Sequence, residues 1–170
     1  NNAVCFCYNF DLMIGMSADK FEPSTTTSRA MIVTTLYRLE GSPAVTGENT
    51  YTDVKDGVWY TDAIIWATEN GIVNGYGNGL YGPHHDVTRE QIATMLYRYA
   101  EYKGVDVSDT TDLAGYTDVD QIHNWALDAM KWANAIELVN GRTETTLNPR
   151  DNTMRSELAT LLYRWSHEIG

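Results

Sequence analysis

The sequence predicts a mainly α-helical domain made of three copies of one helix–loop–helix unit. One segment occurs three times, as FEPSTTTSRAMIVTTLYR at 21–38, YGPHHDVTREQIATMLYR at 81–98 and LNPRDNTMRSELATLLYR at 147–164. Proline and arginine hold the same places in all three copies, with no gap inside the unit. Apolar residues also recur at helical spacing before and within each copy. Together these observations indicate a tandem repeat.

Composition limits the classes of function. At 170 residues, with 43% hydrophobic and 21% charged residues, the chain is long enough for one domain with a sizeable core. The formal net charge of −11 argues against nucleic-acid binding, which requires a basic face. No run approaches the ~18 apolar residues of a membrane span, so no membrane insertion is expected.

The first repeat is assigned to residues 1–41 and is expected to be incomplete at its start, because it lacks the YTDV entry of the other two. Its first helix is predicted at 3–10, where apolar residues fall on one helical face. Ser28 is the expected N-cap of the second helix, and Gly41 is suited to end it. The segment 42–49, rich in Gly, Pro and Ser, is predicted to be a linker.

The second repeat is assigned to residues 50–103. It opens with YTDV at 51–54, and a helix is predicted over 59–70, closed by Gly71. Thr88 should cap the next helix, and Gln91, three residues later, completes a capping box. The acidic segment 104–114 is predicted to be a second linker.

The third repeat is assigned to residues 115–170 and again opens with a YTDV segment. Its first helix is predicted to start near Trp125, with Trp132 and Ala133 facing inward. Its second helix carries Leu158, Leu162 and other apolar residues on one face.

One helix pair cannot bury its apolar face alone. Three pairs can do so through their second helices, in a pseudo-threefold arrangement around a central three-helix bundle. An open solenoid is the alternative, but it would leave apolar end faces exposed.

The repeated arginines suggest a binding chemistry. Arg29, Arg89 and Arg155 each lie in the first turn of a predicted helix. This is the positive end of the helix, which disfavours a cation by about 0.3–1 kcal/mol. A helix N-terminus with free N–H groups plus a guanidinium would bind an anion such as a sugar carboxylate. The alternative is structural: each arginine ties its helix to a loop carbonyl or to a carboxylate such as Asp53 or Asp118.

Aromatic residues and glycines are secondary candidates. Trp59 and Trp125 lie at helix starts and are the better candidates for stacking on a sugar, whereas Trp66 and Trp132 share their spacing with core alanines. Glycines in the turn before each repeated segment permit close approach of a ligand, or simply form the turn. Arg38, Arg98 and Arg164 are interpreted as structural or solvated residues.

Nothing in the sequence indicates catalysis, a cofactor or a metal. The common hydrolase, metalloprotease and phosphate-loop motifs are absent. Cys5 and Cys7 are the only cysteines, a poor set for zinc, and Cys7 aligns with Ala67 and Ala133 as a buried position.

The combined pattern resembles the S-layer homology domain of bacterial cell-surface proteins over nearly the whole chain. The second repeat shows the pattern in full. It begins with YTDV, continues with a tryptophan and the first predicted helix, and then has GIVNGYGNGLYGP followed by VTREQ at the start of the second predicted helix. The resemblance implies a three-pronged pseudo-trimer in which a Ser/Thr-Arg-Ala/Gly-Glu motif opens the second helices and contributes to inter-repeat grooves. Here the fourth position of that motif is Met31, Gln91 or Glu157.

The resemblance also implies a function. We expect the chain to be part of a longer exported polypeptide at the bacterial surface or S-layer, attached non-covalently to a secondary cell-wall polysaccharide on peptidoglycan. In the family this acidic polysaccharide often carries a pyruvylated sugar. A structural or protein-interaction module with degenerate grooves is the alternative, because Met31 and Gln91 depart from the motif. The candidate glycan-binding residues are Arg29, Arg89, Arg155, Gln91, Glu157, Trp59, Trp125, Gly75 and Gly141.

Overall fold

The regular secondary structure of the described residues is helical, which confirms the predicted mainly α class. The computed structural model describes residues 2–15 and 20–169, so the predicted boundaries at residues 1 and 170 lie outside it. Extended pairing in these residues is limited to isolated bridges. No helix in the same residues is both long and apolar enough to cross a bilayer. The α-helices are α1 (Asn2–Asn9), α2 (Arg29–Leu39), α3 (Thr61–Glu69), α4 (Arg89–Tyr102), α5 (Leu127–Ala135) and α6 (Arg155–Arg164). Short 3₁₀ turns η1 (Val119–Gln121) and η2 (Asn124–Ala126) precede α5, and a π-turn η3 (Trp165–Ile169) follows α6.

The predicted helix caps are present. The Ser28 hydroxyl accepts a hydrogen bond from the Met31 backbone N–H, and Thr88 and Gln91 form the full capping box. The helix α3 begins at Thr61, two residues later than expected, because Trp59 and Tyr60 still belong to the preceding turn. Trp125 likewise lies in η2, ahead of α5.

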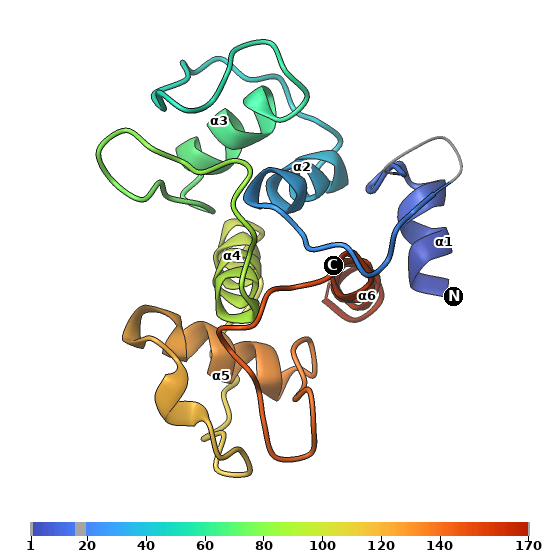
Figure 1. The fold of residues 1–170 in the computed structure, drawn as a ribbon, viewed down its shortest axis with the longest axis vertical. Coiled ribbons are helices and arrows are strands. Elements are labelled where there is room, and N and C mark those ends of the chain that lie inside the picture. The colour runs from blue at the N-terminus through green and yellow to red at the C-terminus, as the bar shows by residue number, and fades with distance from the viewer. Residues whose placement is uncertain (1, 16–19, 170) are drawn as a thin grey trace.

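The helices of one repeat pack mainly on helices of its neighbours. The second helix of each repeat contacts the first helix of the next, as α2 with α3 and α4 with α5, and α6 of the last repeat contacts α1 of the first (Figure 1). The same aromatic contact occurs at all three junctions, between the tyrosine of the Leu-Tyr-Arg triplet and an aromatic residue of the neighbouring helix. The ring centroids are 5.6 Å apart for Tyr37–Trp66, 5.5 Å for Tyr97–Trp132 and 5.7 Å for Tyr163–Phe6.

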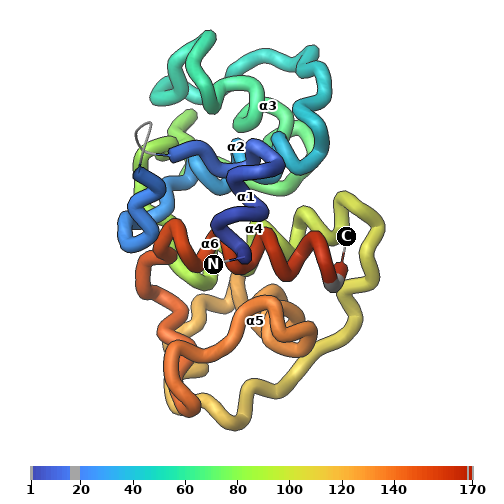
Figure 2. The backbone as a smooth tube through the Cα atoms, turned by 90° about the vertical axis from the view of Figure 1, so that its right-hand side faces the viewer, coloured from blue at the N-terminus to red at the C-terminus, as the bar shows by residue number. Residues whose placement is uncertain are grey.

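A ring of backbone hydrogen bonds joins the three repeats just before their second helices. Thr27 N–H donates to the Thr153 carbonyl (2.8 Å), Thr153 N–H to Val87 (2.8 Å) and Val87 N–H to Thr27 (2.9 Å). The first and last repeats are therefore neighbours, with α1 packed across α6 (Figure 2). Contacts thus run from the first repeat to the second, from the second to the third and from the third to the first.

Candidate inter-repeat grooves

The three repeated arginines are buried and occupy equivalent positions. Their side chains begin in the first turns of α2, α4 and α6, and the residues are 5%, 8% and 4% exposed. In each case Nε and Nη2 donate to two backbone carbonyls of a neighbouring repeat. The acceptors are Tyr81 and Asn74 for Arg29, Leu147 and Asn140 for Arg89, and Phe21 and Ile14 for Arg155, at 2.6–2.9 Å. The structural alternative, a tie to loop carbonyls, thus describes most of their hydrogen bonding.

The expectation of free N–H groups at these helix starts is wrong. The Arg29 and Ala30 N–H groups donate to the His85 and Pro83 carbonyls of the next repeat, and the third N–H of α2 is capped by Ser28. The first turns of α4 and α6 donate in the same way, to carbonyls at 151 and 149 and at 25 and 23. The helix starts hold the repeats together and offer no open anion site of their own.

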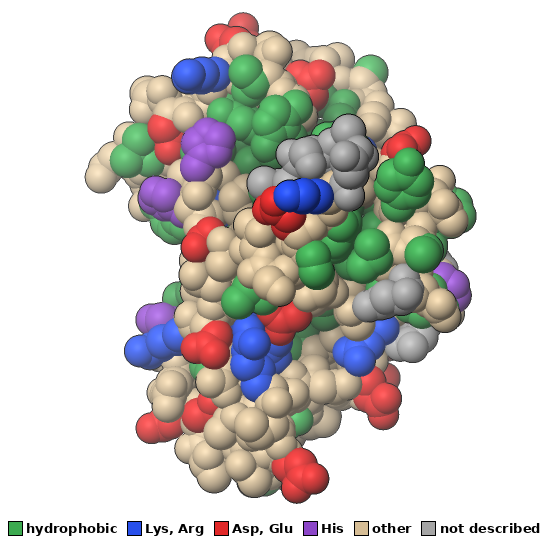
Figure 3. All heavy atoms as spheres, turned by 45° about the vertical axis from the view of Figure 1, so that its right-hand side comes forward, with side chains coloured by type: hydrophobic (Ala, Val, Ile, Leu, Met, Phe, Trp, Pro, Cys, Tyr) green, Lys and Arg blue, Asp and Glu red, His purple; other side chains and the backbone are tan. Residues whose placement is uncertain are grey.

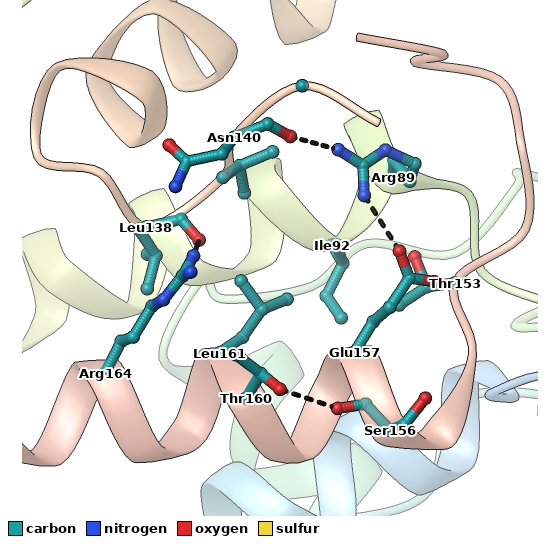
Figure 4. A pocket seen from close by; sticks show the side chains of 12 residues that line it. Arg89, Ile92, Leu138, Asn140, Thr153, Ser156, Glu157, Thr160, Leu161 and Arg164 are labelled. Atoms are coloured by element: carbon teal, nitrogen blue, oxygen red, sulfur yellow. Dashed lines mark hydrogen bonds and ion pairs between the residues drawn. The ribbon is translucent and has the colours of Figure 1, made fainter. Parts of the chain in front are cut away.

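One guanidinium nitrogen, Nη1, remains to face a groove. In Arg89 it donates to Glu157 Oε1 (3.0 Å) (Figure 4). Arg142 donates to the other carboxylate oxygen of Glu157 (3.2 Å). Burial lowers the pKa of Arg89 below its usual range, although the Glu157 carboxylate opposes that shift. Arg89 stays a cation, and Glu157 supplies a matching charge.

The other two guanidinium groups have no carboxylate partner in the described residues. The nearest polar contact of Arg155 Nη1 is the Met31 sulfur, at 3.9 Å, and the guanidinium lies over the Phe21 ring. Arg29 lies between the Tyr76 and Tyr81 rings, 4.6 and 4.5 Å from their centroids. Cation–π contacts partly replace the missing charge.

Three grooves follow from this arrangement, and we number them by the repeat that supplies the arginine. Groove 1 is the smallest, at about 70 Å³, and groove 2 encloses about 270 Å³ and groove 3 about 350 Å³. Groove 1 is lined by Arg29, Asn74, Gln91, Arg98 and Trp125 among others. Groove 2 is lined by residues including Arg89, Asn140, Gly141, Glu157 and Arg164, and groove 3 by Ile14, Met31, Arg38, Trp59, Arg155 and neighbours.

Comparison with known proteins identifies the family. The S-layer homology domain matches residues 50–93 and 115–159, more than half of the chain. An endoglucanase of Bacillus sp. (strain KSM-635) is 32% identical over 161 residues, which is 92% of this chain. The chain belongs to the S-layer homology family.

Other relatives agree with the predicted location at the bacterial cell surface. The surface-layer 125 kDa protein of Lysinibacillus sphaericus is 30% identical and the cellulosome-anchoring protein of Acetivibrio thermocellus 26%, each over 88% of this chain. The chain spans 17%, 12% and 34% of the lengths of these three relatives. Each relative is therefore much longer than the region that it shares with this S-layer homology domain.

The tryptophans divide as the sequence predicts. Trp66 and Trp132 are buried (4% and 0% exposed), whereas Trp59 and Trp125 are 56% and 53% exposed. Each exposed tryptophan lines a groove whose arginine comes from another repeat, Trp59 in groove 3 and Trp125 in groove 1. No tryptophan is among the described residues that line groove 2.

The glycines have a demanding structural role. A Cβ on Gly75 would lie 2.5 Å from the Leu80 carbonyl oxygen and 2.6 Å from the Tyr51 ring. A Cβ on Gly141 would meet Thr143 and Tyr116 in the same way. Gly141 also borders groove 2, but in both turns the glycine leaves room for the protein's own atoms.

The aspartates of the YTDV segments do not pair with the arginines. The Asp53 carboxylate accepts the N–H groups of Tyr81 and Gly82, and Asp118 accepts those of Leu147 and Asn148, at 2.7–2.9 Å. Partial burial raises the pKa of Asp53, but these hydrogen bonds outweigh it and hold the pKa below its usual range. The two aspartates fix the loops whose carbonyls bind the arginines.

Two of the three second arginines have structural contacts, and the third, Arg98, lines groove 1. Arg38 and Arg164 reach the carbonyls of Leu12 and Leu138, just after the first helices of their own repeats. Arg142, in contrast, was missed by the repeat comparison. It corresponds to Tyr76 in the second repeat, so the pattern gives no reason to select it.

Proposed function

We propose that the chain is a non-catalytic anchoring module that binds a secondary cell-wall polysaccharide in the grooves between its repeats. In this proposal the three repeats form a closed pseudo-threefold unit around the second helices, supported by the ring of hydrogen bonds through Thr27, Val87 and Thr153. The unit holds a longer exported protein on the wall, as the name of the cellulosome-anchoring relative suggests.

The observation that carries the proposal is the composition of grooves 1 and 3. Each is lined by two arginines and an exposed tryptophan, and no carboxylate is among the described lining residues. A guanidinium pairs with a carboxylate substituent of a sugar, and an indole face covers an apolar face of the ring. These local cations explain how a protein of net charge −11 can bind an acidic polymer at short range. On the face shown in Figure 3, acidic and basic side chains are interspersed, so no broad basic field is required.

Groove 3 is the best site for an acidic sugar that also carries an apolar group. Its Arg155 has no carboxylate partner among the described residues, and its other walls include Met13, Ile14, Met31 and Trp59. A carboxylate next to a methyl group, as in a pyruvyl ketal, matches both features. Groove 2 is the least open to an anion, because Glu157 already bridges Arg89 and Arg142.

Co-sedimentation with peptidoglycan sacculi tests the proposal. The wild-type chain should bind sacculi that retain their secondary polymer and should not bind sacculi stripped of it by acid. Trp59→Ala and Trp125→Ala should each weaken binding without loss of fold, since both side chains are more than half exposed. Tyr8→Ala, which removes an exposed aromatic ring outside the grooves, is the matched control.

A protein-interaction module is the second candidate, favoured by the largely apolar lining of groove 3. Under that reading neither preparation of sacculi would bind the chain. Equal binding to intact and stripped sacculi would instead indicate attachment to the peptidoglycan itself, which also contradicts the proposal.

A further inference from the structure

A buried carboxylate in α4 contacts the segment that carries the tryptophan of groove 1. The Glu90 side chain is 3% exposed. One of its oxygens accepts the His123 backbone N–H (2.9 Å), and the other lies 2.6 Å from His123 Nδ1. Because a carboxylate only accepts hydrogen bonds, Nδ1 carries a proton here. Glu90 therefore binds both the backbone and the ring of His123, the N-cap residue of η2, and we call this pair of contacts the Glu90–His123 clamp.

The next step leads from His123 to Trp125. The two rings are nearly parallel, 18° apart, with centroids separated by 5.6 Å. Trp125 is 53% exposed, so little protein packs against it from the solvent side. An exposed indole on a short 3₁₀ turn would otherwise sample several rotamers. The Glu90–His123 clamp holds one side of this ring in place.

This clamp is confined to one groove. Aligning Arg89 with Arg29 and Trp125 with Trp59 places Ala30 and Gly57 where groove 1 uses Glu90 and His123. Neither alanine nor glycine can form the same hydrogen bonds, so Trp59 has no corresponding tie to α2. The difference is a property of this sequence and not of the repeat.

We propose that Glu90 is a positioning residue that, through His123, pre-organises Trp125 as the sugar-stacking wall of groove 1. The inference rests on the proposed glycan binding. Fixing a side chain before binding saves the ordering cost that a mobile side chain would incur. Without the contact between Glu90 and His123, the Trp125 side chain would have to be ordered on binding. The affinity that groove 1 contributes should then fall about three- to tenfold.

The first test observes the ring directly, without any glycan. In protein labelled with 5-fluorotryptophan, the ¹⁹F signals of Trp59 and Trp125 are assigned from Trp59→Phe and Trp125→Phe. Glu90→Ala and His123→Ala should each narrow the Trp125 signal and move it towards the position of the free amino acid, with the Trp59 signal unchanged. An unchanged Trp125 signal in both variants would overturn the clamp. His123→Ala is the second route because His123 is 46% exposed, and its loss leaves the core intact.

The second test measures affinity for sacculi that retain their secondary polymer. Glu90→Ala should weaken binding about three- to tenfold. Trp125→Ala should weaken it at least as much, because it also removes the ring, and the double variant should bind no more weakly than Trp125→Ala alone. Glu90→Gln, which keeps an acceptor for one His123 N–H, should lie between Glu90→Ala and wild type. Glu101→Ala, an exposed carboxylate later in α4, is the control.

The outcomes separate the two proposals. Wild-type binding that persists undiminished in Glu90→Ala and His123→Ala, or additive losses in the double variant, would overturn the positioning role and leave the glycan proposal intact. Absence of wild-type binding would overturn the proposed function and the sugar-facing role together, whereas the ¹⁹F result would still decide whether Glu90 immobilises Trp125.

Discussion

Tyr163 in the last helix packs edge-on against Phe6 in the first, with ring centroids 5.7 Å apart and ring planes at 84°. The same junction is made by Tyr37 with Trp66 and by Tyr97 with Trp132. Of the three, only Tyr163–Phe6 joins the two ends of the repeat array. It is therefore the aromatic contact that closes the domain.

Weakening this contact should destabilise the whole domain. We expect Phe6→Ala to lower the free energy of unfolding by about 2–4 kcal/mol, since a large partly buried ring leaves a cavity. The coupling between Phe6→Leu and Tyr163→Leu in a double-mutant cycle should be about 0.5–1.5 kcal/mol. Chemical denaturation provides the measurement. Tyr8→Ala on the same helix, where the side chain is 70% exposed, should change stability by no more than about 0.5 kcal/mol.

The aspartates of the YTDV segments should make stability depend on acid pH. Asp53→Asn removes the charge from two hydrogen bonds and should cost about 1–2 kcal/mol at pH 7. The folded-state pKa of Asp53 is depressed, so its contribution is complete well above the ordinary value of about 3.9. It is lost as the pH falls through that value and then through the lower pKa of the folded state. Wild type should accordingly lose more stability than Asp53→Asn between pH 7 and pH 3, measured by urea unfolding, and equal losses would contradict the assignment.

The turn glycines should be intolerant of a methyl group. Gly141→Ala places a Cβ against the Thr143 carbonyl and the Tyr116 ring and should cost about 1–3 kcal/mol. Gly115→Ala is the control, because a Cβ there meets no atom within 4 Å. Thermal unfolding of the two variants gives the comparison. If Gly141 also contacts glycan, binding of Gly141→Ala to sacculi will fall by more than the fraction of this variant that is unfolded.

The two cysteines should differ sharply in reactivity. Cys7 is fully buried between α1 and α6, and burial raises the pKa of its thiol to about 12. Cys5 is exposed. A disulfide reagent at pH 8 should therefore modify one thiol per native chain and both thiols in guanidinium chloride. Rapid modification of both thiols in the native protein would show that α1 opens readily from α6.

The local structure could be predicted from the sequence because the same helix-start and helix-face residues recur in each repeat. Three copies of the same arginine and the capping box at Thr88 place each second helix without tertiary information. The division between buried Trp66 and exposed Trp59 follows from helical spacing in the same way. Each of these predictions depends on residues within about ten positions of one another.

The site was less predictable because its contacts cross between repeats. The N–H groups of α2 are occupied by carbonyls near residue 84, and nothing in the local sequence reveals that pairing. The Glu90–His123 contact occurs once, at positions where the first and second repeats hold Ala30 and Gly57. A repeat comparison finds what the copies share, whereas the individual character of each groove comes from positions at which they differ.

The closed ring also has a consequence for the order in which the domain is made. Helix α1 is synthesised before the other described helices, but its partner α6 lies about 150 residues later in the chain. At ribosomal rates of about 5–20 residues per second, α1 waits on the order of ten seconds for that partner. Long-range pairing of this kind slows folding, and until it is complete the apolar face of α1 is open to chaperones and proteases. Of the described helices, the one that is made earliest is therefore buried last.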